Sequence, residues 1–276
     1  MTDAPFVSTE WLAASLTDAD LRIVDGSWYL PTAKRDPRAE FLAGHIPGAV
    51  FFDVDEMADL SSGLPHMLQT PEEFSRTAGH LGIADGMRIV VYDGDGLFSA
   101  PRVRWSFVTM GASEVYLLEG GLPKWIAEGR PLETGPTAPA PKTFTARLDP
   151  TAIVDLAYMR QPDRQVVDAR PAARFTGEAP EPRPGIRSGH MPGALNAPFP
   201  TLTENGVLKP AETLRAQFEA TGIDLDKPIV TTCGSGVTAA ALKLALEHAG
   251  ARDVVLYDGA WAEWGSRDDT EVVTGE

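Results

Sequence analysis

Short apolar runs alternate with amphipathic segments along the chain. In the first half, four runs rich in Val, Ile, Leu and aromatic residues each end at Asp or Gly, as buried parallel strands do, and they cover 21–26, 48–53, 88–93 and 115–120. Residues 70–82 begin with Thr70 and Pro71 and end at Gly82, which predicts a capped helix.

The second half follows the same scheme. A strand is predicted over 228–233, and helices are predicted over 210–222 and 237–250. Strands that alternate with helices are typical of parallel sheets joined by right-handed crossovers. We therefore expect an α/β fold in which each half forms a parallel sheet with helices on both faces.

Four motifs occur twice, in the same order. The pairs are "IVDGSWYL" (23–30) with "VVDARPAARF" (166–175), "GHIPGAVFF" (44–52) with "GHMPGALNAPF" (189–199), "RIVVYDGDG" (88–96) with "PIVTTCGSG" (228–236), and "VYLLEGGLPKW" (115–125) with "VVLYDGAWAEW" (254–264). A repeat of this length indicates a duplicated domain. Residues 131–150 hold five prolines and predict an extended linker. We expect domains over 1–135 and 151–276 with a linker over 136–150.

Composition excludes several classes of function. With 24 Lys and Arg against 39 Asp and Glu, the net charge of −15 disfavours nucleic acid as a partner. The chain has no secretory signal pattern and no apolar run near the ~18 residues of a membrane span, so we expect a cytoplasmic protein with no membrane partner. A single cysteine excludes an internal disulfide, a CxxC pair and a thiolate zinc cluster, and we expect neither metal nor cofactor.

The only cysteine, Cys233, follows the predicted strand 228–233 and precedes the predicted helix 237–250. Open α/β sheets bind their ligands at this edge. Gly234 and Gly236 are expected to adopt positive φ and turn the loop amides inward, and the helix N-terminus adds positive potential. Both effects favour a thiolate or a persulfide anion.

The alternative is that Cys233 is a small buried apolar residue, as many cytosolic cysteines are. The internal repeat argues against it, because Asp93 occupies the equivalent position in the first half. If the position served only for packing, its equivalent in the other repeat would not be an ionisable residue. We interpret Cys233 as a nucleophile and Asp93 as the mark of a half that lacks the chemistry.

The combination of "CGSGVTA" at a strand–helix junction with "GHIPGA" and "GHMPGA" upstream resembles the tandem-domain rhodanese superfamily. The loop is more similar to that of 3-mercaptopyruvate sulfurtransferases than to that of thiosulfate sulfurtransferases, whose loops typically carry basic side chains after the cysteine. The resemblance implies a tandem rhodanese fold and transfer of the sulfur of 3-mercaptopyruvate through a Cys233 persulfide, with release of pyruvate. The acceptor would be a thioredoxin-like protein, a small thiol or cyanide.

The same resemblance implies roles for further residues. Ser235, with His66 and Asp55, is similar to a Ser–His–Asp-like triad that supplies a proton to the leaving enolate. Because His66 and Asp55 belong to the first half of the sequence, catalysis is expected to use both halves. A solvated loop histidine and a loop-capping aspartate are the alternatives.

Arg174 and Arg183 align with the substrate-binding arginines of the superfamily, and Arg187 is a possible substitute. A guanidinium fork suits a carboxylate. Gly234, Gly236, Val237 and Thr238 are expected to bind substrate through the loop. His45 and His190 occupy the same place in each repeat and are expected to fix a turn.

Three other functions share part of this residue pattern. A cysteine-loop phosphatase needs an arginine six residues after the cysteine, where this chain has Ala239. A non-catalytic interaction module would not need the cysteine, Ser235 and paired arginines. Thiosulfate sulfurtransferase is the strongest alternative, but its dianionic donor requires positive charge beside the cysteine.

Overall fold

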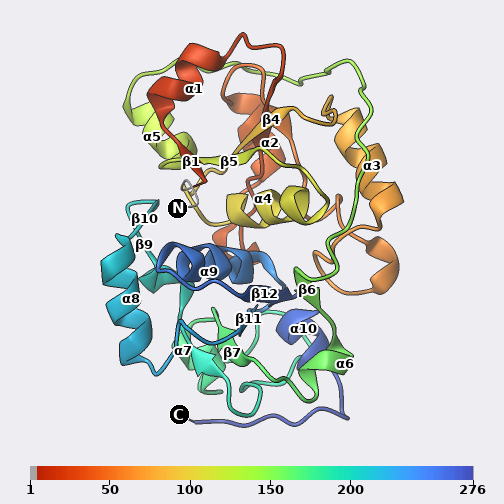
Figure 1. The fold of residues 1–276 in the computed structure, drawn as a ribbon. Helices are drawn as coiled ribbons and strands as arrows, with labels where there is room; N and C mark the ends of the chain where they lie inside the picture. Colours follow the sequence, from red (N-terminus) through yellow and green to blue (C-terminus); the bar gives the residue numbers. More distant parts are fainter. Residues whose placement is uncertain (1–4, 276) are drawn as a thin grey trace. The chain divides into compact units, whose positions relative to one another are not determined.

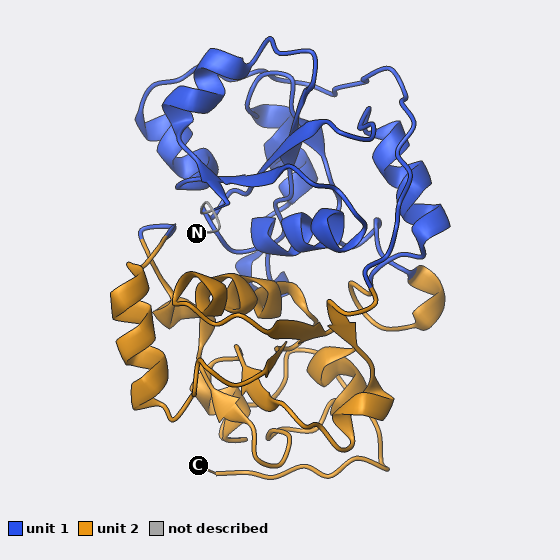
Figure 2. Cartoon of the chain, viewed as in Figure 1, with its two compact units in different colours: residues 1–59, 68–149, 205–207 blue, residues 60–67, 150–204, 208–276 orange. Residues whose placement is uncertain are grey.

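The computed structural model describes residues 5–275 of the chain, which divide into two compact units (Figures 1 and 2). Unit 1 comprises Met1–Asp59, Leu68–Asp149 and Asn205–Val207, and unit 2 comprises Leu60–Met67, Pro150–Glu204 and Leu208–Glu276. The expected linker, 136–150, has no helix or strand, and its residues up to Asp149 group with unit 1.

Unit 1 is built on a parallel sheet of five strands in the order β1-β5-β4-β2-β3. The strands are β1 (Phe6–Val7), β2 (Leu21–Asp25), β3 (Val50–Phe51), β4 (Arg88–Tyr92) and β5 (Val115–Leu118). The helices are α1 (Thr9–Ser15), α2 (Pro37–Ala43), α3 (Pro71–His80), α4 (Ala100–Thr109) and α5 (Gly121–Ala127), with 3-10 turns η1 (Pro31–Ala33) and η2 (Leu60–Ser62), the latter grouped with unit 2.

Helices cover both faces of the unit 1 sheet (Figure 1). On one face, Leu12 of α1, Phe41 of α2 and Trp125 of α5 pack with alternate residues of β2 and β4. On the other, α4 lies against β4 and β5, and Phe107 of α4 packs edge to face with Phe74 of α3 at 5.1 Å between ring centroids. Burial on two faces explains why these strands read as continuous apolar runs.

Unit 2 repeats the arrangement with a parallel sheet in the order β6-β12-β11-β7-β8. The strands are β6 (Ile153–Val154), β7 (Gln165–Asp168), β8 (Leu195–Asn196), β11 (Ile229–Thr232) and β12 (Val254–Tyr257), and β9 (Thr203–Glu204) with β10 (Val207–Leu208) form a small separate sheet. The helices are α6 (Leu156–Met159), α7 (Ala172–Phe175), α8 (Ala211–Ala220), α9 (Val237–His248) and α10 (Ala260–Trp264), with the 3-10 turn η3 (Phe199–Thr201).

The two faces of the unit 2 sheet are also covered. Met159 of α6 and Trp261 of α10 pack with Val166 of β7 and Val230 of β11. The apolar helix α9 lies against β11 and β12 on the other face, with α8 beside it. The α/β fold expected from the sequence is therefore confirmed in each unit, and the predicted strands and helices occur within a few residues of their predicted bounds.

The paired histidines have the same surroundings in both units. His45 Nδ1 lies 2.7 Å from the carbonyl oxygen of Phe41, and its ring stacks on that phenyl ring. His190 Nδ1 lies 2.9 Å from the carbonyl oxygen of Phe175 and stacks in the same way. Each histidine thus ties a short helix to the turn that follows it, which confirms the turn-fixing role expected of them.

Candidate active site

Cys233 lies at the carboxyl end of β11, in the four-residue loop that leads into α9. Its side chain is buried, and the amide of Gly236 donates a hydrogen bond to the sulfur at 3.1 Å. Gly236 has a φ of 84°, which turns this amide back toward Cys233 and requires glycine. The thiol therefore lies at the amino end of a twelve-residue helix, where the potential is positive.

Gly234 corrects one expectation. It is not among the residues of positive φ, so backbone conformation does not require glycine there. A Cβ atom at this position would instead lie 2.9 Å from Nη2 of Arg174. Glycine at 234 therefore permits an arginine to approach the loop closely.

The loop is also fixed from the side of α10. The amide of Trp261 donates to the carbonyl oxygen of Cys233 at 2.8 Å, and the amide of Ala262 donates to that of Gly234 at 3.0 Å. Ala260, at the start of α10, has a φ of 53°, an unfavourable value for alanine. Two loop carbonyl groups are thus bound to α10.

The equivalent loop of unit 1 encloses a carboxylate. Asp93 accepts hydrogen bonds from the amide of Asp95 at 3.0 Å and from the amides of Ser99 and Ala100 at 2.8 Å each. Burial raises the pKa of Asp93 above its usual range, and these amides act in the opposite direction. In both units the amide of the helix N-cap, Gly236 or Ser99, therefore donates to the side chain that follows the strand, and in unit 1 that side chain is a carboxylate.

Ser235 and His66 form a buried pair. His66 Nδ1 lies 3.0 Å from Ser235 Oγ. The sequence places His66 in the first half, but the segment Leu60–Met67 groups with unit 2, so the pair is internal to that unit. His66 has a φ of 60°, a strained conformation for a residue other than glycine.

Asp55, the third expected member of the triad, belongs to unit 1. Its carboxylate accepts a hydrogen bond from Trp28 Nε1 at 3.0 Å. Its assignment to a relay with His66 stays a prediction from the family resemblance.

Arg174 lies on α7 and contacts Gly234, whereas Arg183 lies in the loop between α7 and β8. Arg187 has a different role. Its guanidinium donates to the carbonyl oxygens of Trp264, Gly265 and Thr270 at 3.0–3.2 Å and to Thr270 Oγ1 at 2.6 Å. Since these bonds commit Arg187 to the segment after α10, it is not a substitute for Arg174 or Arg183.

Two acidic residues beside these arginines were not predicted from the sequence. Asp168 ends β7 and Glu181 lies in the loop after α7, and both are almost fully buried. They bind Arg170, a residue also missed, which is 1% exposed. The sequence signal was Arg170, which lies two residues after the strand-terminal Asp168, at the position that Ser27 occupies after Asp25 in the first repeat.

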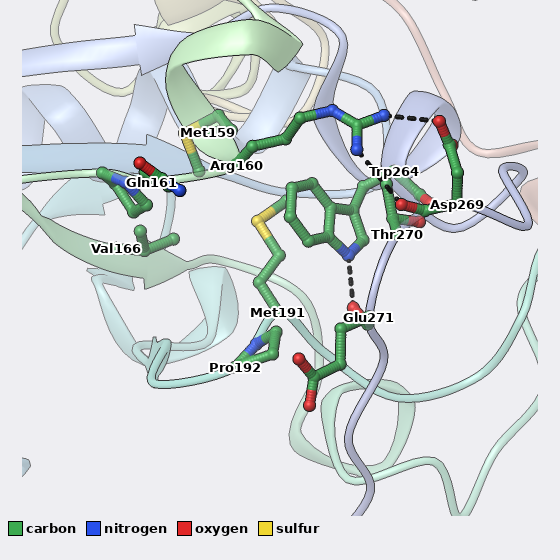
Figure 3. A pocket seen from close by; sticks show the side chains of 11 residues that line it. Met159, Arg160, Gln161, Val166, Met191, Pro192, Trp264, Asp269, Thr270 and Glu271 are labelled. Atoms are coloured by element: carbon green, nitrogen blue, oxygen red, sulfur yellow. Dashed lines mark hydrogen bonds and ion pairs between the residues drawn. The ribbon is translucent and has the colours of Figure 1, made fainter.

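A cavity of about 410 Å³ lies in another part of unit 2 (Figure 3). It is lined by Met159, Val166, Met191 and Trp264 with a polar rim, and none of its residues belongs to the Cys233 loop. On the rim, Arg160 pairs with Asp269, and Trp264 Nε1 donates to the carbonyl oxygen of Glu271 at 2.8 Å. Neither a nucleophile nor the arginines named above line it.

Residues 5–275 contain neither a candidate metal site nor a candidate membrane span. Within that range, no three His, Cys, Asp or Glu side chains are grouped as metal ligands would be. None of the helices described there combines the length and apolar character that crossing a membrane demands.

Two repeated α/β units, one with a cysteine in an amide-lined loop and one with an aspartate there, are the architecture of a tandem rhodanese. The Rhodanese-like domain family matches residues 8–128 and 155–267. The chain belongs to this family.

Several relatives cover nearly its whole length. A 3-mercaptopyruvate sulfurtransferase of Escherichia coli is 44% identical over 99% of both chains. A thiosulfate sulfurtransferase of Gallus gallus is 43% identical over 94% of this chain and 92% of its own. The crystal structure of SseA from Escherichia coli, described as a 3-mercaptopyruvate sulfotransferase, superposes with a TM-score of 0.86 at 42% identity, covering 94% of this chain and 99% of that one.

Proposed function

We propose that the protein is a 3-mercaptopyruvate sulfurtransferase. The observation that carries the proposal is the hydrogen bond between His66 and Ser235, which lies two residues after the proposed nucleophile Cys233. Relatives of nearly equal identity include both mercaptopyruvate and thiosulfate enzymes, so the donor is inferred from the site.

The reaction proceeds in two steps. The Cys233 thiolate attacks the sulfur of 3-mercaptopyruvate, an S–S bond forms, and the C–S bond breaks with its electron pair left on carbon. The resulting enolate takes up one proton and leaves as pyruvate. An acceptor thiolate then attacks the outer sulfur and regenerates Cys233; cyanide would give thiocyanate in the same way.

The loop provides for the anions in both steps. The amide of Gly236 contacts the sulfur of Cys233, and it and the amides of Val237 and Thr238 at the start of α9 stabilise the persulfide in the same manner as the unit 1 loop stabilises Asp93. Gly234 adds no bulk there. No charged side chain of the loop is needed for this function.

Proton delivery is the role of the polar pair. A hydroxyl alone is a weak acid, but Ser235 in contact with His66 can pass on a proton that the imidazole replaces. Asp55 stays the third member of this relay that the family resemblance implies. Arg174 and Arg183 bind the carboxylate of the substrate, since two guanidinium groups suit an anionic 2-oxo acid in a chain of net charge −15.

Thiosulfate transfer is the second candidate. Its leaving group, sulfite, departs without a proton, and its dianionic donor favours a cation beside the nucleophile. Residues 233–242 contain neither Lys nor Arg to bind the dianionic donor. A proton relay through Ser235 and His66 is not needed for thiosulfate. The site therefore favours the mercapto acid.

Parallel assays with the two donors test the proposal, with one acceptor thiol held saturating. We expect kcat/KM for 3-mercaptopyruvate to exceed that for thiosulfate, with pyruvate released in step with sulfur transfer. A preference for thiosulfate would overturn the assignment of donor. A thioredoxin-like protein or a small thiol as acceptor, and a cytoplasmic location, stay predictions.

A further inference from the structure

The guanidinium of Arg174 is held by one carboxylate. Nε of Arg174 donates to Glu181 Oε1 at 3.1 Å, and Nη2 donates to Glu181 Oε2. This side-on pairing uses two of the five N–H donors of the group and leaves the end formed by Nη1 and Nη2 for a second anion. Nη2 is also the atom that approaches Gly234 of the catalytic loop.

Glu181 is also bound by a second arginine, Arg170. Its Oε1 also accepts a hydrogen bond from Arg170 Nη1 at 2.8 Å. Arg170 is bound by Asp168 through Nε at 2.9 Å and Nη2 at 2.7 Å, and its guanidinium lies 4.2 Å from the ring centroid of Trp261. Burial alone lowers the pKa of Arg170, but the two carboxylates raise it overall, so the group stays charged.

The exposed fractions of the three side chains show that Arg170 holds Glu181 in place and that Glu181 in turn holds Arg174. The side chains of Arg170 and Glu181 are 1% and 4% exposed, whereas that of Arg174 is 17% exposed. An immobile arginine therefore fixes a buried carboxylate, and the carboxylate fixes a more accessible arginine beside Gly234. Two guanidinium and two carboxylate groups also leave the cluster without net charge, so it does not favour a dianion over a singly charged carboxylate.

We propose that Glu181 is a positioning residue for the donor. It holds Arg174 side-on, so that the end of the guanidinium faces the carboxylate of 3-mercaptopyruvate next to Cys233. This inference rests on the proposed function.

The two half-reactions separate positioning from a general structural role. In a ping-pong scheme, kcat/KM for the donor reports only persulfide formation, and kcat/KM for the acceptor reports only its consumption. We expect Glu181→Gln to lower the donor value by roughly tenfold, the scale of a lost charge-assisted hydrogen bond, and to leave the acceptor value unchanged. Equal losses in both values would show a smaller folded fraction and overturn the proposal.

A double-mutant cycle tests whether Glu181 acts through Arg174. In an Arg174→Ala background, Glu181→Gln should change the donor kcat/KM by less than about twofold, because nothing is left to position. The same tenfold loss in that background would contradict the inference.

Two further variants control for stability. Asp168→Asn removes the other carboxylate from Arg170 but leaves both hydrogen bonds between Glu181 and Arg174 in place, so it should lower the unfolding midpoint and lower the donor kcat/KM less than Glu181→Gln does. Glu181→Asp retains the buried charge but is one methylene too short to hold both arginines, so it should fold well and still lower the donor value. A loss in Asp168→Asn as large as in Glu181→Gln would overturn the proposal, as would a wild-type donor value in Glu181→Asp.

Failure of the proposed function is recognised separately. If the wild-type protein releases no pyruvate from 3-mercaptopyruvate, the donor assignment fails. If wild type is active and Glu181→Gln matches it, only the positioning role fails.

Discussion

His66 Nδ1 lies 3.0 Å from Ser235 Oγ, although 169 residues separate the two in the chain. Both side chains are buried, so the hydrogen bond is shielded from solvent. The hydroxyl two residues after Cys233 thereby gains an imidazole partner, the side chain most often used for general acid–base catalysis. This relationship distinguishes the site from one that requires only positive charge.

Loss of that pair should affect the two donors differently. Ser235→Ala and His66→Ala are each expected to lower kcat/KM for 3-mercaptopyruvate by about 10²-fold, the usual scale of general acid–base assistance. Thiosulfate turnover should change much less, because sulfite leaves without a proton. The ratio of the two kcat/KM values is the measurement, and an equal loss for both donors in Ser235→Ala would show that the serine only shapes the loop. Asp55→Asn should shift the ratio in the same direction.

The nucleophile is tested by intact-protein mass spectrometry. Incubation with 3-mercaptopyruvate without acceptor should add one sulfur atom to wild type and none to Cys233→Ser, since the chain has no second cysteine. Adding the acceptor thiol should remove the adduct. An adduct of equal size on the Cys233→Ser protein would refute a persulfide at this position.

The carboxylate site is tested at Arg174. Arg174→Ala should lower kcat/KM for 3-mercaptopyruvate roughly ten- to a hundredfold, which corresponds to ~1.5–3 kcal/mol for each lost charge-assisted contact. Arg174→Lys should recover only part, because an ammonium cannot make the paired bonds to Glu181 that the guanidinium makes. Arg183→Ala should also lower the value, and wild-type kinetics in both alanine variants would place the carboxylate elsewhere.

Asp25, at the end of β2, should make stability depend on pH. Burial raises its pKa from 3.8 to about 6, against the hydrogen bonds from Ser27. Because the folded state keeps this proton longer than the unfolded state, the free energy of unfolding should fall as pH rises from about 4 to about 6, by an amount on the order of 3 kcal/mol from this group.

Comparison with Asp25→Asn isolates that contribution. The difference in unfolding free energy between the variant and wild type should move in favour of the variant across the same pH window, measured by urea denaturation. A difference that stays constant between pH 4 and pH 6 would exclude a raised pKa for Asp25.

Much of the fold is determined by local sequence. The β-branched runs, the capped start of α3 at Thr70 and the glycine at 236 act through backbone preferences of neighbouring residues, so they can be read along the chain. The internal repeat adds that Cys233 and Asp93 occupy equivalent loops. These facts suffice to predict the α/β units and the nucleophile.

Other features were decided only by tertiary structure. Which half His66 joins depends on the course of residues 60–67, which no periodic pattern specifies. Among several arginines in 164–187, only the fold commits Arg187 to carbonyl groups and pairs Arg174 with Glu181. Gly234 was expected to adopt a positive φ, but it does not; glycine at this position instead leaves room for the guanidinium of Arg174. Local preferences act over a few residues, whereas ion pairs and close contacts are chosen by side chains that the folded chain brings together from distant positions.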